Sequence, residues 1–179
     1  MKLALNILIC LYTAFISEAY AGPIDDVMLH GTTIASHGET VLTARSTATG
    51  LDVKVVFDTK EIDIGTPSEP KPKNMNLSCT YSRFPCSPVV NMGIVVNGME
   101  LHVPRNVFRD LADVDAAKII FHDKSAVLTI VGGDASASYI ETVQFDGEHV
   151  NRTTLASGMA PDKVLQETIY HYLPEDYFK

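Results

Sequence analysis

An Asn-Gly dipeptide between two runs of β-forming residues constrains the fold of this chain more than any other feature. Asn97 and Gly98 separate 94–96 from 99–103. Asn-Gly is the strongest short signal for a two-residue hairpin turn, because both turn residues need a positive φ. A turn of this length predicts the register and pairs Val96 with Met99 and Ile94 with Leu101. The sequence therefore predicts an antiparallel hairpin here.

Asp146 and Gly147 form a second turn signal, between 138–145 and 148–155. A two-residue turn at this position predicts three cross-strand pairs, namely Phe145 with Glu148, Val143 with Val150, and Glu141 with Arg152. The last pair joins opposite charges across two strands, which contributes about 0.2–1 kcal/mol. We interpret this charge match as support for the register, because a slip by one residue gives Glu141 a different partner.

Other segments have the patterns of further strands. Residues 40–46 are rich in β-formers, and 51–57 alternate as a half-buried strand does. The alternating apolar face consists of Leu51, Val53, Val55 and Phe57. A run over 126–131 is apolar on both faces and predicts a central strand.

Three less regular segments complete the predicted fold. Residues 104–113 predict a short helix, because Pro is favoured at the first helical position and the apolar residues that follow share one face. Residues 22–37 predict a leading segment or an edge strand. Residues 162–173 fit either a helix or a strand, and we favour a strand because they follow a run of hairpins. The predicted class is mainly β: an antiparallel β-sandwich or strongly curved sheet built from hairpins, with one short helix near 104–113.

One domain is predicted behind a secretory signal peptide. Residues 1–21 combine a basic start, an apolar run and an Ala-x-Ala cleavage site. Residues 22–179 then form a single mainly-β domain with a long loop over 61–87, which is rich in proline before it reaches two cysteines. We expect a periplasmic or secreted protein with no membrane span after cleavage.

Charge and motifs exclude several function classes. The net charge of −8 at pH 7 argues against nucleic-acid binding. The chain has no Gly-x-Ser-x-Gly, no His-Glu-x-x-His and no phosphate-binding glycine loop. Asp110, Asp113 and Asp115 lack the spacing of a calcium loop, and we interpret them as an acidic helix end at the surface. The sequence therefore predicts no enzyme, no metal site and no cofactor.

Cys79 and Cys86 are the two cysteines that remain after cleavage, and we expect them to form a disulfide in an oxidising compartment. The ring that they close contains Tyr81, Arg83 and Phe84, residue types that dominate interface hot spots. A rigid loop binds with a smaller ordering entropy. We interpret the ring as a contact surface for another protein. The alternative is that its aromatic residues pack inward and the disulfide holds the end of a strand.

Two short segments carry local resemblances. The ring sequence "CTYSRFPC" resembles the reactive loop of Bowman–Birk-type serine protease inhibitors, although it is one residue shorter and has one proline where that family usually has two. This resemblance implies that Tyr81 enters a protease pocket. The segment Ser136-Ala137-Ser138-Tyr139 is similar to the Ser-x-x-Tyr loop with which some bacterial periplasmic lysozyme inhibitors plug an active site. It implies that Ser136 and Tyr139 contact an enzyme.

The sequence as a whole favours an exported, non-catalytic binding module that contacts another protein. One alternative is a periplasmic inhibitor of a hydrolase, of the lysozyme or serine protease type. A second alternative is a small-ligand carrier, which needs an apolar cavity. An enzyme with a site assembled from distant loops, for example from His102, His122 and His149, is the remaining one.

Overall fold

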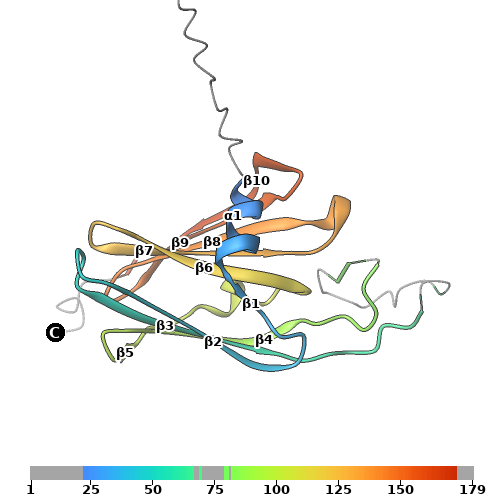
Figure 1. Cartoon of the computed structure of the whole chain (residues 1–179), viewed down its shortest axis with the longest axis horizontal. Coiled ribbons are helices and arrows are strands. Elements are labelled where there is room, and N and C mark those ends of the chain that lie inside the picture. The colour runs from blue at the N-terminus through green and yellow to red at the C-terminus, as the bar shows by residue number, and fades with distance from the viewer. Residues whose placement is uncertain (1–21, 67–68, 70–78, 81, 173–179) are drawn as a thin grey trace, which may run out of the picture.

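The computed structural model describes residues 22–66, 69, 79–80 and 82–172. Two antiparallel sheets face each other as a β-sandwich, with a short helix on the outer face of one of them (Figure 1). This architecture confirms the predicted class. The signal-peptide prediction for 1–21 lies outside the described residues. Within the described part, no helix is long and apolar enough to cross a membrane.

The larger sheet has six strands in the order β1-β6-β7-β8-β9-β10. Its elements are β1 (Thr32–Thr33), β6 (Val114–His122), β7 (Ser125–Gly132), β8 (Tyr139–Phe145), β9 (Val150–Ser157) and β10 (Ala160–Ile169). The run over 126–131 lies in β7, between β6 and β8, and the prediction of a central strand is confirmed. The ambiguous segment after residue 160 forms the edge strand β10, as favoured above, up to Ile169.

The smaller sheet has four strands in the order β2-β3-β4-β5. Its elements are β2 (Gly38–Ser46), β3 (Leu51–Thr59), β4 (Val89–Val96) and β5 (Met99–Glu100). The alternation of β3 is confirmed, since every second side chain from Leu51 to Thr59 is buried. The Asn97-Gly98 register is confirmed as well, because Val96 pairs with Met99 and the Leu101 amide donates to the Ile94 carbonyl at 2.8 Å.

The main core lies between the two sheets. Phe57, Ile94 and Val53 contribute from the smaller sheet, and Leu128 and Phe145 contribute from the larger one. All five are fully buried. Burial of such side chains stabilises a fold by about 1.5–3 kcal/mol each, so these five together contribute about 8–15 kcal/mol.

The first described segment contains a helix that the sequence did not predict. Helix α1 (Pro23–His30) packs its buried Val27 against Ala116, Val131 and Ile140 on the outer face of the larger sheet. Pro23 occupies the first turn, where a missing amide hydrogen has no cost. A leading segment or an edge strand was expected here; the short strand β1 follows the helix and pairs with β6 at the edge of the larger sheet.

The region 104–113 forms a single 3-10 turn, η1 (Arg105–Val107), where a longer helix was predicted. Hydrogen bonds to residues 87 and 89 hold the end of this segment in a non-helical conformation. The Leu111 carbonyl accepts from the Val89 amide, and the Asp113 amide donates to the Ser87 carbonyl. The apolar residues of this segment are buried as expected, but in a connection that closes one side of the sandwich.

The register predicted for the second hairpin is wrong. Phe145 pairs with Val150, and Glu141 pairs with Leu155 instead of Arg152. The turn is longer than two residues because the Asp146 carboxylate accepts the amides of Glu148 and His149, both at 2.8 Å. This Asx-type turn replaces the expected hairpin turn. Arg152 forms its ion pair with Glu167 of β10.

Candidate functional site

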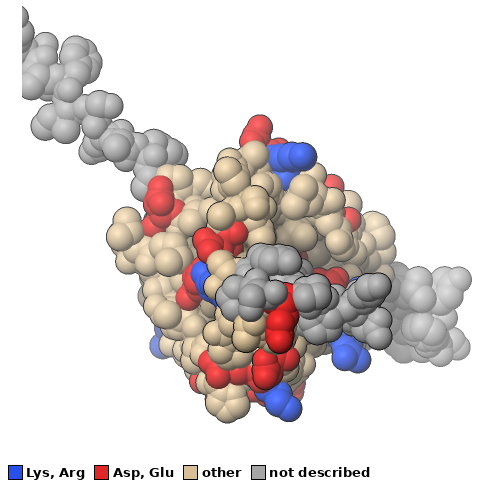
Figure 2. Space-filling view, turned by 90° about the vertical axis from the view of Figure 1, so that its right-hand side faces the viewer, with Lys and Arg blue, Asp and Glu red and all other residues tan. Residues whose placement is uncertain are grey.

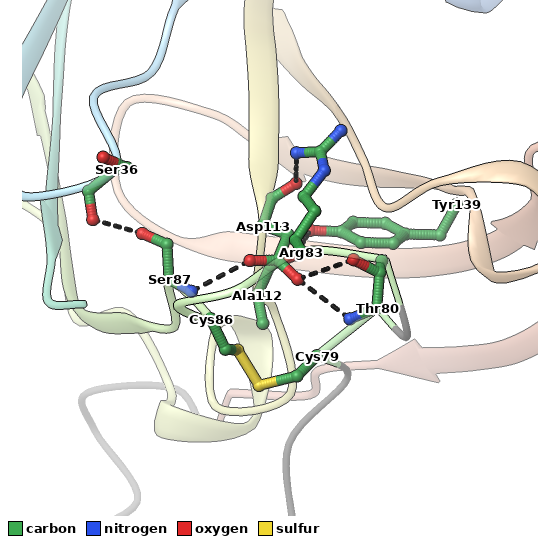
Figure 3. The surroundings of a disulfide bond; sticks show 9 residues. All are labelled: Ser36, Cys79, Thr80, Arg83, Cys86, Ser87, Ala112, Asp113 and Tyr139. Carbon is green, nitrogen blue, oxygen red and sulfur yellow. Dashed lines mark hydrogen bonds between the residues drawn. A yellow bond between two sulfur atoms is a disulfide. The ribbon is translucent and has the colours of Figure 1, made fainter. Parts of the chain in front are cut away.

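The disulfide ring is fixed to the sandwich through one buried carboxylate. Cys79 and Cys86 form the predicted disulfide, with their Cα atoms 5.5 Å apart. On either side of it, the Thr80 amide and hydroxyl donate to Asp113 Oδ2 at 2.8 and 3.0 Å, and the Ser87 amide donates to Asp113 Oδ1 at 2.9 Å (Figure 3). Asp113 is 3% exposed, so its assignment to a wet surface is wrong.

Arg83 fastens the same ring to the loops at the end of the larger sheet. Its guanidinium forms a bidentate ion pair with Asp115, with contacts of 2.8 and 3.1 Å. It also donates to the carbonyls of Asp113 and Gly133, at 3.0 and 3.1 Å. The ion pair raises the pKa of Arg83 above its ordinary value. These contacts give Arg83 a structural role, and its role in partner binding stays a prediction.

The other ring residues divide between core and surface. Phe84 is half-buried and packs against a small cluster formed by the disulfide, Ile64 and Ala112. Ser82 and Pro85 are exposed. Tyr81 lies outside the described residues. The interpretation in which the ring pins a strand end therefore accounts for Arg83 and for much of Phe84.

Ser136 and Tyr139 have different environments. Ser136 lies in the one-turn η2 (Ala135–Ala137) and is exposed. Tyr139 is 6% exposed, and its hydroxyl donates to the Ala112 carbonyl at 2.9 Å. Burial raises the pKa of this hydroxyl strongly. The Tyr139 side chain is thus bonded within the fold, and its contact role, like that of Ser136, stays a prediction.

The end of the sandwich that carries these loops faces the viewer in Figure 2. Asp and Glu side chains predominate over Lys and Arg on this face. Exposed carboxylates of this region include those of Asp63, Glu69 and Asp134. Such a surface concentrates cations near the protein and repels anions.

A pocket of about 400 Å³ opens between the 106–111 connection and the last three strands of the larger sheet. Pockets of roughly 300–1,000 Å³ are typical of small-molecule sites. Its residues come from four separate segments. They are Asn106, Val107, Asp110 and Leu111; Ser136–Tyr139 and Glu141; Thr153, Leu155 and Ser157; and Lys163, Leu165 and Gln166. A β-bulge in β10 contributes to this wall, because the register shifts between Val164 and Gln166.

Glu141 is the unusual residue of this pocket. It lies on the inward face of β8, between Tyr139 and Val143, and only 6% of it is exposed. Its direct neighbours across the sheet are Ile130 on β7 and Leu155 on β9. Among the described residues, its carboxyl group forms no hydrogen bond or ion pair, and its oxygen atoms are accessible from the pocket, since no fully buried side-chain oxygen of the described part lacks a hydrogen-bond partner. Burial raises the pKa of Glu141 from 4.5 to about 8.

Other polar groups surround the same space. The Thr153 side chain is 5% exposed, and within the described part of the chain its hydroxyl has no recorded hydrogen bond. Asp110 and Lys163 also line the pocket, Lys163 from an exposed position on β10. The pocket thus combines apolar walls with one carboxyl group and one hydroxyl group that open into it. Such an arrangement orients a bound molecule.

Sequence reasoning missed Glu141 because it assigned this residue a cross-strand partner. The available signal was its place in the alternation, where a charged residue interrupts the inward row of Tyr139, Val143 and Phe145. His102, His122 and His149 are absent from the pocket lining. In the part of the chain that is described, no group of three His, Cys, Asp or Glu residues could hold a metal ion.

The fold and the site together define a class of protein: a β-sandwich with one loop closed by a disulfide and with a pocket beside the last three strands of its larger sheet. No protein-family model, no curated protein and no solved structure matches this chain.

Proposed function

We propose that this protein is a non-catalytic binding protein of an oxidising, extracytoplasmic compartment, and that the pocket beside Glu141 holds its ligand. The single observation that carries this proposal is Glu141, a mostly buried residue whose carboxyl group opens into the pocket and has no protein partner among the described residues. The mostly apolar surroundings of this carboxyl group disfavour its charged form. A bound ligand that supplies a hydrogen bond or an opposite charge offsets this cost.

The disulfide supports the compartment in this proposal. Disulfides persist outside the cytosol and are rare within it. The Cys79–Cys86 bond closes a small ring that is already held by Asp113 and Arg83. A ligand-binding protein in an oxidising compartment needs such a fixed frame, because the walls of its pocket come from loops as well as strands.

A ligand screen with a pocket-filling variant tests the proposal. Leu165 lines the pocket on the exposed edge strand, and Val164 beside it does not. We expect some members of a library of small polar and amphipathic molecules to raise the melting temperature of the wild type and of Val164→Trp. The same molecules should have no effect on Leu165→Trp. Equal effects on both variants, or no effect on the wild type, contradict the proposal.

A protein partner for the ring is a second candidate function. Its support is the exposure of Ser82 and Pro85 on a ring that Asp113 and Arg83 hold in place. Capture of a partner by the wild type and not by Phe84→Ala, with both shown to be folded by circular dichroism, is the expected result. Equal capture by both excludes the ring as the recognition element.

The inhibitor alternatives are tested by adding this protein at micromolar concentration to lysozyme and to a chymotrypsin-like protease. Undiminished activity of both enzymes excludes these alternatives.

An enzyme is the remaining alternative, because two carboxyl groups, those of Asp110 and Glu141, line one pocket. Pairs of carboxyl groups with different pKa values perform acid–base hydrolysis in other proteins. Turnover of a chromogenic glycoside or ester that is lost in both Asp110→Asn and Glu141→Gln supports this alternative over a binding protein. We expect no turnover.

A further inference from the structure

We propose that the ligand of the Glu141 pocket is an organic cation, a primary ammonium group on an apolar body, and that its ammonium group pairs with the Glu141 carboxylate. This inference rests on the binding function proposed above and names the chemical class of its ligand. An ammonium group donates three hydrogen bonds, and its positive charge compensates the negative charge of a carboxylate in apolar surroundings. No described residue performs this role for Glu141.

The walls around Glu141 fit an apolar body. Leu155 lies directly opposite on β9, and Val107, Leu111 and Leu165 line the same space. These side chains provide contact area for a hydrocarbon chain, and each buried CH₂ contributes about 0.8 kcal/mol. The ligand class therefore combines one cationic head with one apolar chain or ring.

Thr153 supplies a second anchor for the head group. Val143, two positions after Glu141 on β8, pairs with Thr153 on β9, so Thr153 is a diagonal neighbour of Glu141. Both side chains are more than nine-tenths buried, and both line the pocket. A hydroxyl oxygen accepts one ammonium hydrogen while the carboxylate accepts another. Two acceptors at one place favour an ammonium group over a tertiary amine or a hydroxyl group.

Three titratable groups face Glu141 from the elements around it. They are Asp110 from the 106–111 connection, Tyr139 from β8 and Lys163 from β10; the lining residues of η2 and β9 carry none. Tyr139 donates its hydroxyl hydrogen to the Ala112 carbonyl and is therefore not free to donate to Glu141. Lys163 is exposed and has no recorded ion pair in the described structure, so it competes with the ligand only by moving inward. Asp110 adds a negative charge that favours a cation.

Proton release distinguishes this ligand class from a neutral one. In the empty pocket the pKa of Glu141 is about 8, so below that pH the carboxyl group is protonated. An ammonium ligand binds the ionised form and displaces the proton. Its affinity therefore rises by about 50-fold from pH 6 to pH 8 and levels off above, because the ionised fraction rises over this interval. A neutral hydrogen-bond acceptor uses the protonated form and loses affinity above pH 8.

Titration calorimetry with three probes that share one tail tests the inference. The probes are n-hexylammonium, hexan-1-ol and hexanoate, each added to the purified protein at pH 6, 7 and 8. We expect hexylammonium to bind at least tenfold more tightly than the other two at pH 8, with release of about one proton at pH 6 to 7. Glu141→Gln should lose at least tenfold in hexylammonium affinity, whereas Glu39→Gln, an exposed carboxylate on β2, should be unchanged.

The outcomes separate this inference from the function on which it rests. Stronger binding of hexanol or hexanoate than of hexylammonium, with Leu165→Trp abolishing it, overturns the cationic ligand and leaves the pocket as a binding site. Equal hexylammonium affinity in Glu141→Gln and the wild type also overturns the inference. No binding of any probe at millimolar concentration overturns it too, and the library screen then decides on the pocket itself. Tighter binding by Lys163→Met than by the wild type supports it, since a competing cation is removed.

Discussion

Replacement of Glu141 by Gln is expected to stabilise the protein at alkaline pH. The carboxyl group lies between Ile130 and Leu155, where ionisation has no compensating partner among the described residues. Its folded pKa of about 8 lies above its ordinary value of 4.5. A raised folded pKa means that the native state binds the proton more tightly than the unfolded state does. The stability of the wild type therefore falls as pH rises from 4.5 to 8 and is level above.

The size of the effect follows from the same pKa difference of about 3.5 units. Each pKa unit corresponds to 1.36 kcal/mol, so ionisation of Glu141 destabilises the native state by about 5 kcal/mol above pH 8 and by about 3 kcal/mol at pH 7. Gln has a similar volume and does not ionise. The variant should therefore lose none of this free energy, apart from a constant cost of its buried amide that does not depend on pH.

Urea denaturation at pH 5, 7 and 9 measures the difference. We expect the free energy of unfolding of Glu141→Gln, relative to the wild type, to increase by about 3–5 kcal/mol between pH 5 and pH 9. Glu39→Gln on the exposed face of β2 serves as the control and should follow the wild type. Parallel pH dependence in the wild type and Glu141→Gln refutes the reasoning, because it means that the carboxyl group is hydrated or paired.

Three further predictions concern the anchored ring, and chemical denaturation at pH 7 measures all of them. Arg83→Ala removes the ion pair with Asp115 and two hydrogen bonds to carbonyls, and should lower the free energy of unfolding by about 2–3 kcal/mol. Arg83→Lys should recover less than half of this lost free energy, and its full recovery contradicts the bidentate geometry. Asp113→Ala leaves two buried amides unpaired and should cost about 3 kcal/mol or more; a loss below 1 kcal/mol is the contrary result. Reduction of Cys79–Cys86 should cost about 2.5 kcal/mol, and an unchanged midpoint under reducing conditions argues against this contribution.

Strand positions were predictable because they depend on local alternation. The inward row of β3 and the Asn97-Gly98 hairpin follow from period-two patterning and from one turn dipeptide. The second hairpin was not predictable in register, because the Asp146 side chain caps two amides and lengthens the turn. Side-chain capping of this kind competes with the turn that the Asp-Gly dipeptide alone favours.

Tertiary contacts decided the two segments that were predicted least well. The apolar pattern of 104–113 suits a helix, but the chain continues after η1 as a turn, and hydrogen bonds to Val89 and Ser87 hold its end at Leu111 and Asp113. Helix α1 gains most of its stability from packing on the larger sheet, which no local signal reports.

The disulfide was predictable from compartment and cysteine number, but its setting was not. The sequence "DLADVD" predicts that Asp113 is a surface residue. Only the fold places its carboxylate against the Thr80 and Ser87 amides. Glu141 was assigned to a cross-strand ion pair, because the predicted register placed it opposite Arg152. A pocket built from four segments has no pattern in the linear sequence, although the charged residue on an apolar strand face was visible.

The most direct test of the account is a carbon-13 NMR titration of the Glu141 side-chain carboxyl group. We expect a midpoint near pH 8 in the protein without ligand and a midpoint at least one pH unit lower with saturating hexylammonium. A midpoint near the ordinary value of 4.5 in the ligand-free protein contradicts it, because the carboxyl group is then neither buried nor available to a cationic ligand in the way that the pocket implies.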